Sequence, residues 1–198
     1  MSSSAVPATA IEPEWKLPNK GDIGMYSLIV GESSIFTIFV VAYIFYIGKS
    51  LTGPTPREAL EVPVFPTICL LSSSVTMHAA ISALRKANLA AFRLLWFATF
   101  ALGLIFLIET GREWHHLIYE KGLTISTNLF GTTYYSLVGL HAFHVTVGLI
   151  ALCLVLLLSL AGKVTEEYAK QVDVLAIYWH FVDAVWVVVF TVVYIVGR

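Results

Sequence analysis

The stretch from Val147 to Leu160 reads VGLIALCLVLLLSL and decides the fold. It carries no charge, and it continues an apolar segment that begins near residue 129. About 20 apolar residues are enough to cross the hydrocarbon core of a bilayer. Because lipid offers no hydrogen-bond partner to the backbone, such a run must be helical. A membrane-spanning barrel is excluded, since its strands would alternate polar and apolar residues.

Four other stretches are similarly apolar, so the sequence predicts five membrane-spanning helices. The expected spans cover residues 23–47, 63–84, 92–113, 129–161 and 174–197. The predicted fold class is therefore an all-α membrane protein, a bundle of five transmembrane helices in one domain (1–198). A polar N-terminal segment covers residues 1–22 and lacks the short apolar core of a cleaved signal. Residues 48–62, 85–88, 111–128 and 162–173 are expected to form the connections.

The overall composition supports a membrane protein. Of the 198 residues, 58% are hydrophobic and only 13% are charged, so a water-soluble globule is not expected. The formal net charge is -1 and no basic tract occurs, which argues against nucleic-acid binding. The two cysteines, Cys69 and Cys153, lie in apolar stretches outside any CxxC or CxxCH motif. Neither a disulfide, nor covalently attached haem, nor a zinc site is therefore expected.

Basic residues at the ends of the spans predict the orientation of the chain. Seven lysines and arginines flank the spans on the N-terminal side of the membrane, and five flank them on the other side. Cytoplasmic loops carry the excess of basic residues. The N-terminus is therefore expected in the cytoplasm and the C-terminus on the opposite side.

Aromatic residues lie mostly near the span ends. Examples are Trp96, Tyr134, Trp179 and Tyr194. Tryptophan and tyrosine side chains often anchor a helix at the level of the lipid headgroups. We interpret these residues as interfacial anchors.

Ionisable residues inside the spans are the candidate functional residues, because such groups are costly in lipid and usually face protein or water. The strongest single candidate is Glu32, because its neighbours Gly31, Ser33 and Ser34 are small enough to let another backbone approach. Its two possible uses are a structural hydrogen bond and a part in proton movement. The other candidates are His78, Glu113, His141, His144, His180 and Asp183.

Two pairs of these residues share a helix face, because three positions separate His141 from His144 and His180 from Asp183. The simpler interpretation is hydrogen bonding between helices. Metal or haem ligation is the alternative, with His78, His144 or His180 as the candidate axial ligands of a haem. No span supplies a Glu-x-x-His pair in its interior, so a dimetal site is not expected. The residues that follow Glu113 end the third span, and this cluster is interpreted as a solvated helix end.

Five segments spread over most of the chain carry the motifs of one known family. They are Gly24–Tyr43 with Glu32, Leu60-Glu61-Val62-Pro63, Glu113-Trp114-His115-His116-Leu117, residues 139–148 (GLHAFHVTVG) and residues 178–186 (YWHFVDAVW). The last two are specific. In this order on five spans, the segments resemble subunit III of the haem-copper respiratory oxidases, the cytochrome c and quinol oxidases.

The resemblance implies a non-catalytic subunit of a bacterial inner-membrane complex. It would pack against the catalytic subunit I, with subunit II in the same complex. Haem and copper are expected in those partners, and bound phospholipid but no metal or catalytic residue in this chain. In the family, the residue matching Glu32 is a buried, carbodiimide-reactive carboxyl. The subunit supports proton uptake and protects the catalytic subunit during turnover. Packing or an intramembrane hydrogen-bond network is then the implied role of His78, Glu113, His141, His144, Trp179, His180, Asp183 and Trp186.

One departure from the pattern affects the expected lipid site. The chain begins with the helix that carries Glu32, as in five-span bacterial members, whereas longer members have two additional N-terminal helices. Part of the family's lipid cleft is then not expected here. Three other functions remain open: an accessory subunit of a nitric oxide reductase, an autonomous proton or cation conductor using Glu32, His180 and Asp183, and a membrane cytochrome.

Overall fold

The structure, a computed structural model, describes residues 20–197. Its five long helices are α1 (Lys20–Tyr46), α3 (Val64–Arg85), α4 (Leu89–Tyr119), α5 (Leu129–Leu160) and α6 (Ala169–Phe190). Short elements are α2 (Pro56–Ala59), the 3-10 turn η1 (Glu166–Tyr168) and the π-helical η2 (Thr191–Val196). The described residues contain no strand, and five helices are long and apolar enough to span a membrane. The predicted all-α class is confirmed.

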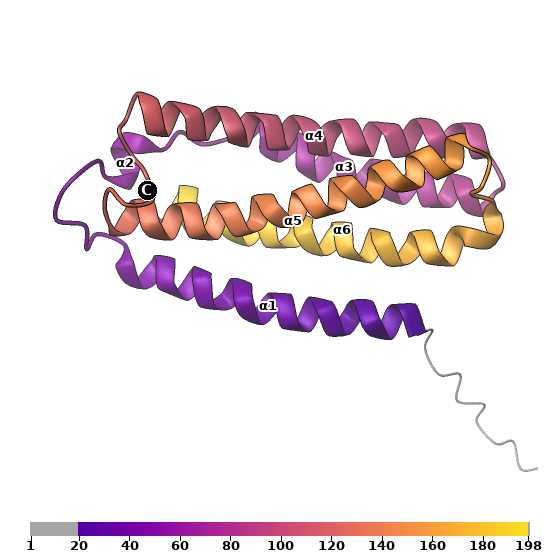
Figure 1. The fold of residues 1–198 in the computed structure, drawn as a ribbon, viewed down its shortest axis with the longest axis horizontal. Coiled ribbons are helices and arrows are strands. Elements are labelled where there is room, and N and C mark those ends of the chain that lie inside the picture. Colours follow the sequence, from indigo (N-terminus) through magenta and orange to yellow (C-terminus); the bar gives the residue numbers. More distant parts are fainter. Residues whose placement is uncertain (1–19, 198) are drawn as a thin grey trace, which may run out of the picture.

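The long helices run side by side, with neighbours in the sequence pointing in opposite directions (Figure 1). A tight turn joins α3 to α4, and Asn88 caps α4 by accepting a hydrogen bond from the Ala91 N–H at 3.1 Å. α5 contacts α1, α4 and α6, and α6 also contacts α3. α1 lies at the edge of the bundle, against α5 and α6 (Figure 1).

The helices extend beyond the spans expected from hydropathy. α4 continues past residue 113 to Tyr119, so the connection expected over residues 111–128 is largely helical at its start. Hydropathy marks where a helix stops being compatible with lipid, and a polar sequence can continue the same helix into water. α1 likewise begins at Lys20 and α6 at Ala169. The polar segment 1–22 lies outside the described residues except for its last three.

The aromatic side chains that were interpreted as interfacial anchors fill the centre of the bundle. Trp96, Tyr134 and Trp179 are fully buried, and Tyr194 is only 2% exposed. The anchor interpretation is wrong for these four residues, because closeness to a helix end does not decide which way a side chain points. The indole of Trp179 shows how tightly this core is packed. A Cβ added to Gly103 or Gly148 would lie 2.7 to 2.8 Å from its ring atoms.

α1 is packed much less closely. Its buried side chains are Phe36 and Tyr43. Gly24 and Gly31 have no neighbouring atom where a side chain would be. Most of the surface of α1 therefore faces outward, toward lipid or another polypeptide.

Candidate functional site

Glu32 of α1 and His144 of α5 form a pair across the helix interface. Oε2 of Glu32 lies 3.0 Å from Nε2 of His144, and Nδ1 of the same ring lies 2.7 Å from the Leu140 carbonyl oxygen. Because a carbonyl only accepts, Nδ1 carries a hydrogen and donates it to Leu140. One further proton is then shared: it lies on Nε2 of a cationic imidazole or on the carboxyl of Glu32. The pair can hold a proton in either form.

The surroundings of this pair are mostly apolar. The His144 side chain is 7% exposed and that of Glu32 is 23% exposed. The Phe36 ring lies 5.0 Å from the imidazole, centroid to centroid, and the Tyr178 hydroxyl donates to the His144 carbonyl at 3.0 Å. These contacts hold His144 in place, whereas part of the Glu32 side chain stays uncovered.

His180 and Asp183 belong to a second group, which Ser74 of α3 joins. The Ser74 hydroxyl donates to Oδ2 of Asp183, and its oxygen lies 2.9 Å from Nδ1 of His180. Since the serine hydrogen points to the carboxylate, Nδ1 of His180 must donate to the serine oxygen. Among the described residues, Oδ1 of Asp183 is buried without a hydrogen-bond partner. The sequence placed His180 and Asp183 on one face of the helix. The Ser74 hydroxyl, which the sequence did not single out, contacts both of them.

A second serine holds Trp179. Its indole N–H donates to the Ser73 hydroxyl at 2.8 Å. The signal for both serines was the run Ser72-Ser73-Ser74 within an otherwise apolar helix. Hydroxyls are common between membrane helices, so this run alone did not identify their partners.

His78 is exposed, and together with His180 it lines a cleft of about 450 Å³. The cleft lies between α1, α3 and α6, and Asp22 and Tyr26 line its α1 side. Arg85 and Asp173 also line it and form an ion pair at 2.6 Å. This cleft brings His180 within reach of small polar molecules.

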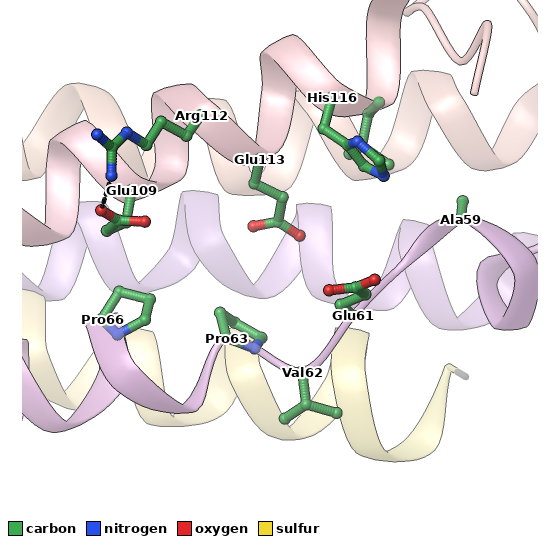
Figure 2. Close-up of a pocket in the computed structure, with 10 residues that line it drawn as sticks. Ala59, Glu61, Val62, Pro63, Pro66, Glu109, Arg112, Glu113 and His116 are labelled. Atoms are coloured by element: carbon green, nitrogen blue, oxygen red, sulfur yellow. Dashed lines mark hydrogen bonds and ion pairs between the residues drawn. The ribbon is translucent and has the colours of Figure 1, made fainter. Parts of the chain in front are cut away.

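Glu113 lies toward the other end of the bundle and faces a cavity of about 310 Å³ (Figure 2). Glu61 lies on the opposite wall, in the segment before α3. Both carboxylate oxygens of Glu113 accept from the Tyr194 hydroxyl, at 2.9 and 3.0 Å. The side chain is half-buried and held in place, which differs from the solvated helix end expected from the sequence.

His141 and Trp186 form an aromatic stack in the core, with ring centroids 5.0 Å apart. The Trp186 N–H donates to the Thr67 hydroxyl at 3.1 Å. Both ring nitrogens of His141 are buried without a hydrogen-bond partner in residues 20–197. In the same range, no three His, Cys, Asp or Glu side chains are grouped closely enough to hold a metal ion.

The fold and these sites define an integral membrane protein with ionisable groups sheltered between its helices. The family model described as cytochrome c oxidase subunit III matches residues 19–198. The chain is 36% identical to cytochrome c oxidase subunit 3 of Alkalihalophilus pseudofirmus over 177 residues, which cover 88% of this chain and 86% of the relative.

Two further relatives give the same result. Cytochrome c oxidase subunit 3 of Synechocystis sp. is 37% identical over 182 residues, 90% of this chain and 76% of the relative. The protein of the same name from Bacillus sp. is 31% identical over 177 residues, with coverages of 88% and 85%. The chain belongs to the cytochrome c oxidase subunit III family, so the resemblance seen in its motifs is confirmed. As a subunit III, it is part of an oxidase complex in a membrane.

Proposed function

We propose that this chain is the non-catalytic subunit III that packs against subunit I of a haem-copper oxidase, and that its Glu32–His144 pair supports proton uptake. Subunit II lies in the same complex, and haem and copper are held by those partners. The observation that carries the proton role is the 3.0 Å contact between Glu32 and His144. The excess of basic residues supports a cytoplasmic N-terminus in a bacterial inner membrane.

The exposure of Glu32 supports a partner next to α1. An ionisable side chain in the middle of an apolar helix is rarely left facing lipid tails. Yet 23% of the Glu32 side chain is uncovered in the isolated chain. A neighbouring polypeptide, or polar lipid held between the two, would complete its surroundings in the complex.

The geometry of the pair supports a role in proton movement. A group that passes protons must accept and release one in place, and an imidazole nitrogen can do both. The Nδ1 contact with Leu140 fixes the ring, so Nε2 stays directed at Glu32 in both protonation states. The pair can therefore exchange a proton with its surroundings without a change of rotamer.

The test uses the purified oxidase complex with Glu32→Ala and Glu32→Gln. Both variants should assemble with wild-type haem content, but turnover at pH 8 should slow, or the active lifetime should shorten several-fold. Glutamine keeps a hydrogen-bonding amide and cannot exchange the proton, so it should behave like alanine. Glu120→Gln, at an exposed position after α4, is the matched control. Wild-type turnover and lifetime in Glu32→Gln would contradict the proton role and leave a packing role.

Bound phospholipid is the non-protein component that we propose for this chain. The cleft that holds His78 and His180 supports it, because Arg85 lies at this cleft and arginine recognises phosphate well. Lipid extraction and mass spectrometry of the purified complex test this proposal. Arg85→Ala should lower the amount of retained lipid relative to Lys163→Ala, a basic residue at the same end of the bundle outside the cleft. Equal lipid content in the two variants would contradict it.

A further inference from the structure

A connected row of buried Trp and Tyr rings crosses the bundle from α6 to α4. It begins with Trp186, whose ring centroid lies 6.3 Å from that of Tyr194 in η2. The Tyr194 hydroxyl lies 3.3 Å from that of Tyr134 in α5. The ring of Tyr134 is 5.2 Å from Tyr135, which is 5.5 Å from Trp114 of α4. Rings this close can pass an electron from one to the next by tunnelling.

The hydrogen bonds in this row have a defined direction. The single hydroxyl hydrogen of Tyr194 points to the carboxylate of Glu113. The oxygen of Tyr194 is then an acceptor, so the Tyr134 hydroxyl donates to it. The chain of donors runs from Tyr134 through Tyr194 and ends on the carboxylate, which faces the cavity that Figure 2 shows.

A base beside a phenol decides whether the phenol can be oxidised. A phenol that loses an electron becomes a strong acid, and a buried site does not tolerate the extra positive charge. The electron can therefore leave only if the proton moves to a nearby base within hydrogen-bond reach. For Tyr194 that base is Glu113, 2.9 Å away.

Two other buried tyrosines, Tyr135 and Tyr178, lack this arrangement. The Tyr135 hydroxyl donates to the Leu123 carbonyl, and the Tyr178 hydroxyl donates to the His144 carbonyl. A backbone carbonyl does not take up the proton. The π-helical turn η2 holds Tyr194 with its hydroxyl against α4, and π-helical turns occur often at functional sites.

We propose that Tyr194 is a redox-active tyrosine that delivers an electron to a strong one-electron oxidant while its proton moves to Glu113. By chemical class the oxidant would be an oxidised haem of the partner subunit, so this inference rests on the proposed oxidase function. In the step, the O–H bond of Tyr194 breaks, its electron would pass to this one-electron oxidant, and its proton binds to the Glu113 carboxylate. A neutral tyrosyl radical and a protonated Glu113 are left. The reverse transfer restores both groups when a reductant returns the electron.

The row of aromatic rings gives this electron transfer a protective function. An oxidising equivalent that is not consumed at the oxygen-reducing centre damages the protein around it. Trp186, Tyr134, Tyr135 and Trp114 extend from Tyr194 in two directions, so the equivalent can move away from its source. The oxidising equivalent is expected to settle on Tyr194, because Glu113 lies beside its hydroxyl as a base.

The test places a ring-fluorinated tyrosine at position 194 of the chain in the purified oxidase complex. Fluorine splits the electron paramagnetic resonance signal of a tyrosyl radical, so a radical at this position is distinguished from radicals elsewhere. Two oxidants are used: hydrogen peroxide, which forms high-valent haem in the complex, and a flash-generated ruthenium(III) polypyridyl, which needs no haem. A fluorine-split signal is expected with both. The same label at Tyr168, an exposed position without a carboxylate partner in the described residues, should give no stable split signal.

A second set of variants tests the role of Glu113. Glu113→Gln removes the proton acceptor and should lower the radical yield roughly 100-fold, the lower range for a positioned base. Glu120→Gln, on an exposed residue after the end of α4, should leave the yield unchanged. Haem absorbance of each preparation verifies that the complex has assembled.

Each contrary result has a separate meaning. No split signal with ruthenium(III), or an unchanged yield in Glu113→Gln, overturns the assignment of Tyr194 as a redox-active residue. A signal with ruthenium(III) but none with peroxide overturns the haem as its oxidant. A chain that purifies without haem contradicts the proposed function instead, and the ruthenium(III) measurement then still decides the chemistry of Tyr194.

Discussion

α1 and the last span are anchored in the bundle in different ways. In its most apolar stretch, 11% of the residues of α1 are buried, against 44% in the span that contains α6. α6 places Trp179 and Trp186 in the centre, where each indole is both packed and hydrogen-bonded. α1 contributes Phe36, Tyr43 and the carboxyl of Glu32. The fold of this chain therefore depends on α6, whereas the position of α1 also depends on what covers its outer side.

The largest expected effect is in the core of the bundle, at Trp179 of α6. Trp179→Ala removes the ring that fills the space beside Gly103 and Gly148 and leaves the Ser73 hydroxyl without its donor. We expect a loss of about 3 to 5 kcal/mol in unfolding free energy, as for other buried aromatic truncations. Thermal unfolding in detergent measures it. Tyr119→Ala, with its ring 75% exposed, is the control and should change little. Similar stability of the two variants would contradict the packing described for α6.

Removal of Ser74 should have the next largest effect. Ser74→Ala leaves both Nδ1 of His180 and Oδ2 of Asp183 without a partner, which costs about 1 to 3 kcal/mol for a buried polar group. His180→Leu should cost less, because Ser74 still donates to Asp183. Subunit stoichiometry after detergent purification and unfolding temperature give the ranking. Ser27→Ala is the control, since that hydroxyl bonds within its own helix. A larger loss in His180→Leu than in Ser74→Ala would show that Ser74 is not the central bond.

The interface of α1 should respond more weakly. A double-mutant cycle with Glu32→Ala and His144→Ala should give a coupling energy of about 0.6 to 1.7 kcal/mol, the range for polar contacts between membrane helices. The reason is the 3.0 Å contact that joins α1 to α5. Additive single effects would mean that this pair does not hold α1 in place. Packing of Phe36 and Tyr43 would then be what holds α1 against the bundle.

The smallest expected effect lies outside the membrane, at α2. The Thr55 backbone N–H donates to the Glu58 carboxylate at 3.0 Å, and this bond, with the Thr55 side chain, lowers the pKa of Glu58. A carboxyl with a lowered folded-state pKa adds stability above its ordinary pKa of 4.5, and this stability is lost as the pH falls through the lowered value. Hydrogen exchange of the α2 amides should therefore be faster in Glu58→Ala than in wild type at pH 7. At a pH below the lowered pKa of Glu58 the two should converge, and a persistent difference there would contradict the linkage.

The sequence predicted the class of the fold and all five spans, because apolar length is read directly from composition. It did not predict where helices end. The charged residues Arg112 and Glu113 end the apolar stretch of the third span. No residue after them breaks a helix before Gly122, so α4 continues to Tyr119. The π-helical form of the last turns had no sequence signal either.

The candidate site was predicted as a set of residues but not as a set of contacts. Glu32 and Asp183 were named together as possible parts of one proton or cation path, yet Glu32 meets His144 and Asp183 meets Ser74. Distance along a helix axis gives the depth of a residue. The direction in which its side chain points depends on how the helices are rotated against one another. Tyr194 was missed for the same reason, since a tyrosine near a helix end faces headgroups or the core depending on that rotation.

Purification of the tagged chain from membranes in mild detergent tests most directly the claim that a larger redox complex shelters these polar groups. Haem absorbance is expected in the eluate at a fixed ratio to this chain, with subunit I identified beside it by mass spectrometry. A homogeneous, colourless preparation of this chain alone that is stable in detergent would contradict this claim.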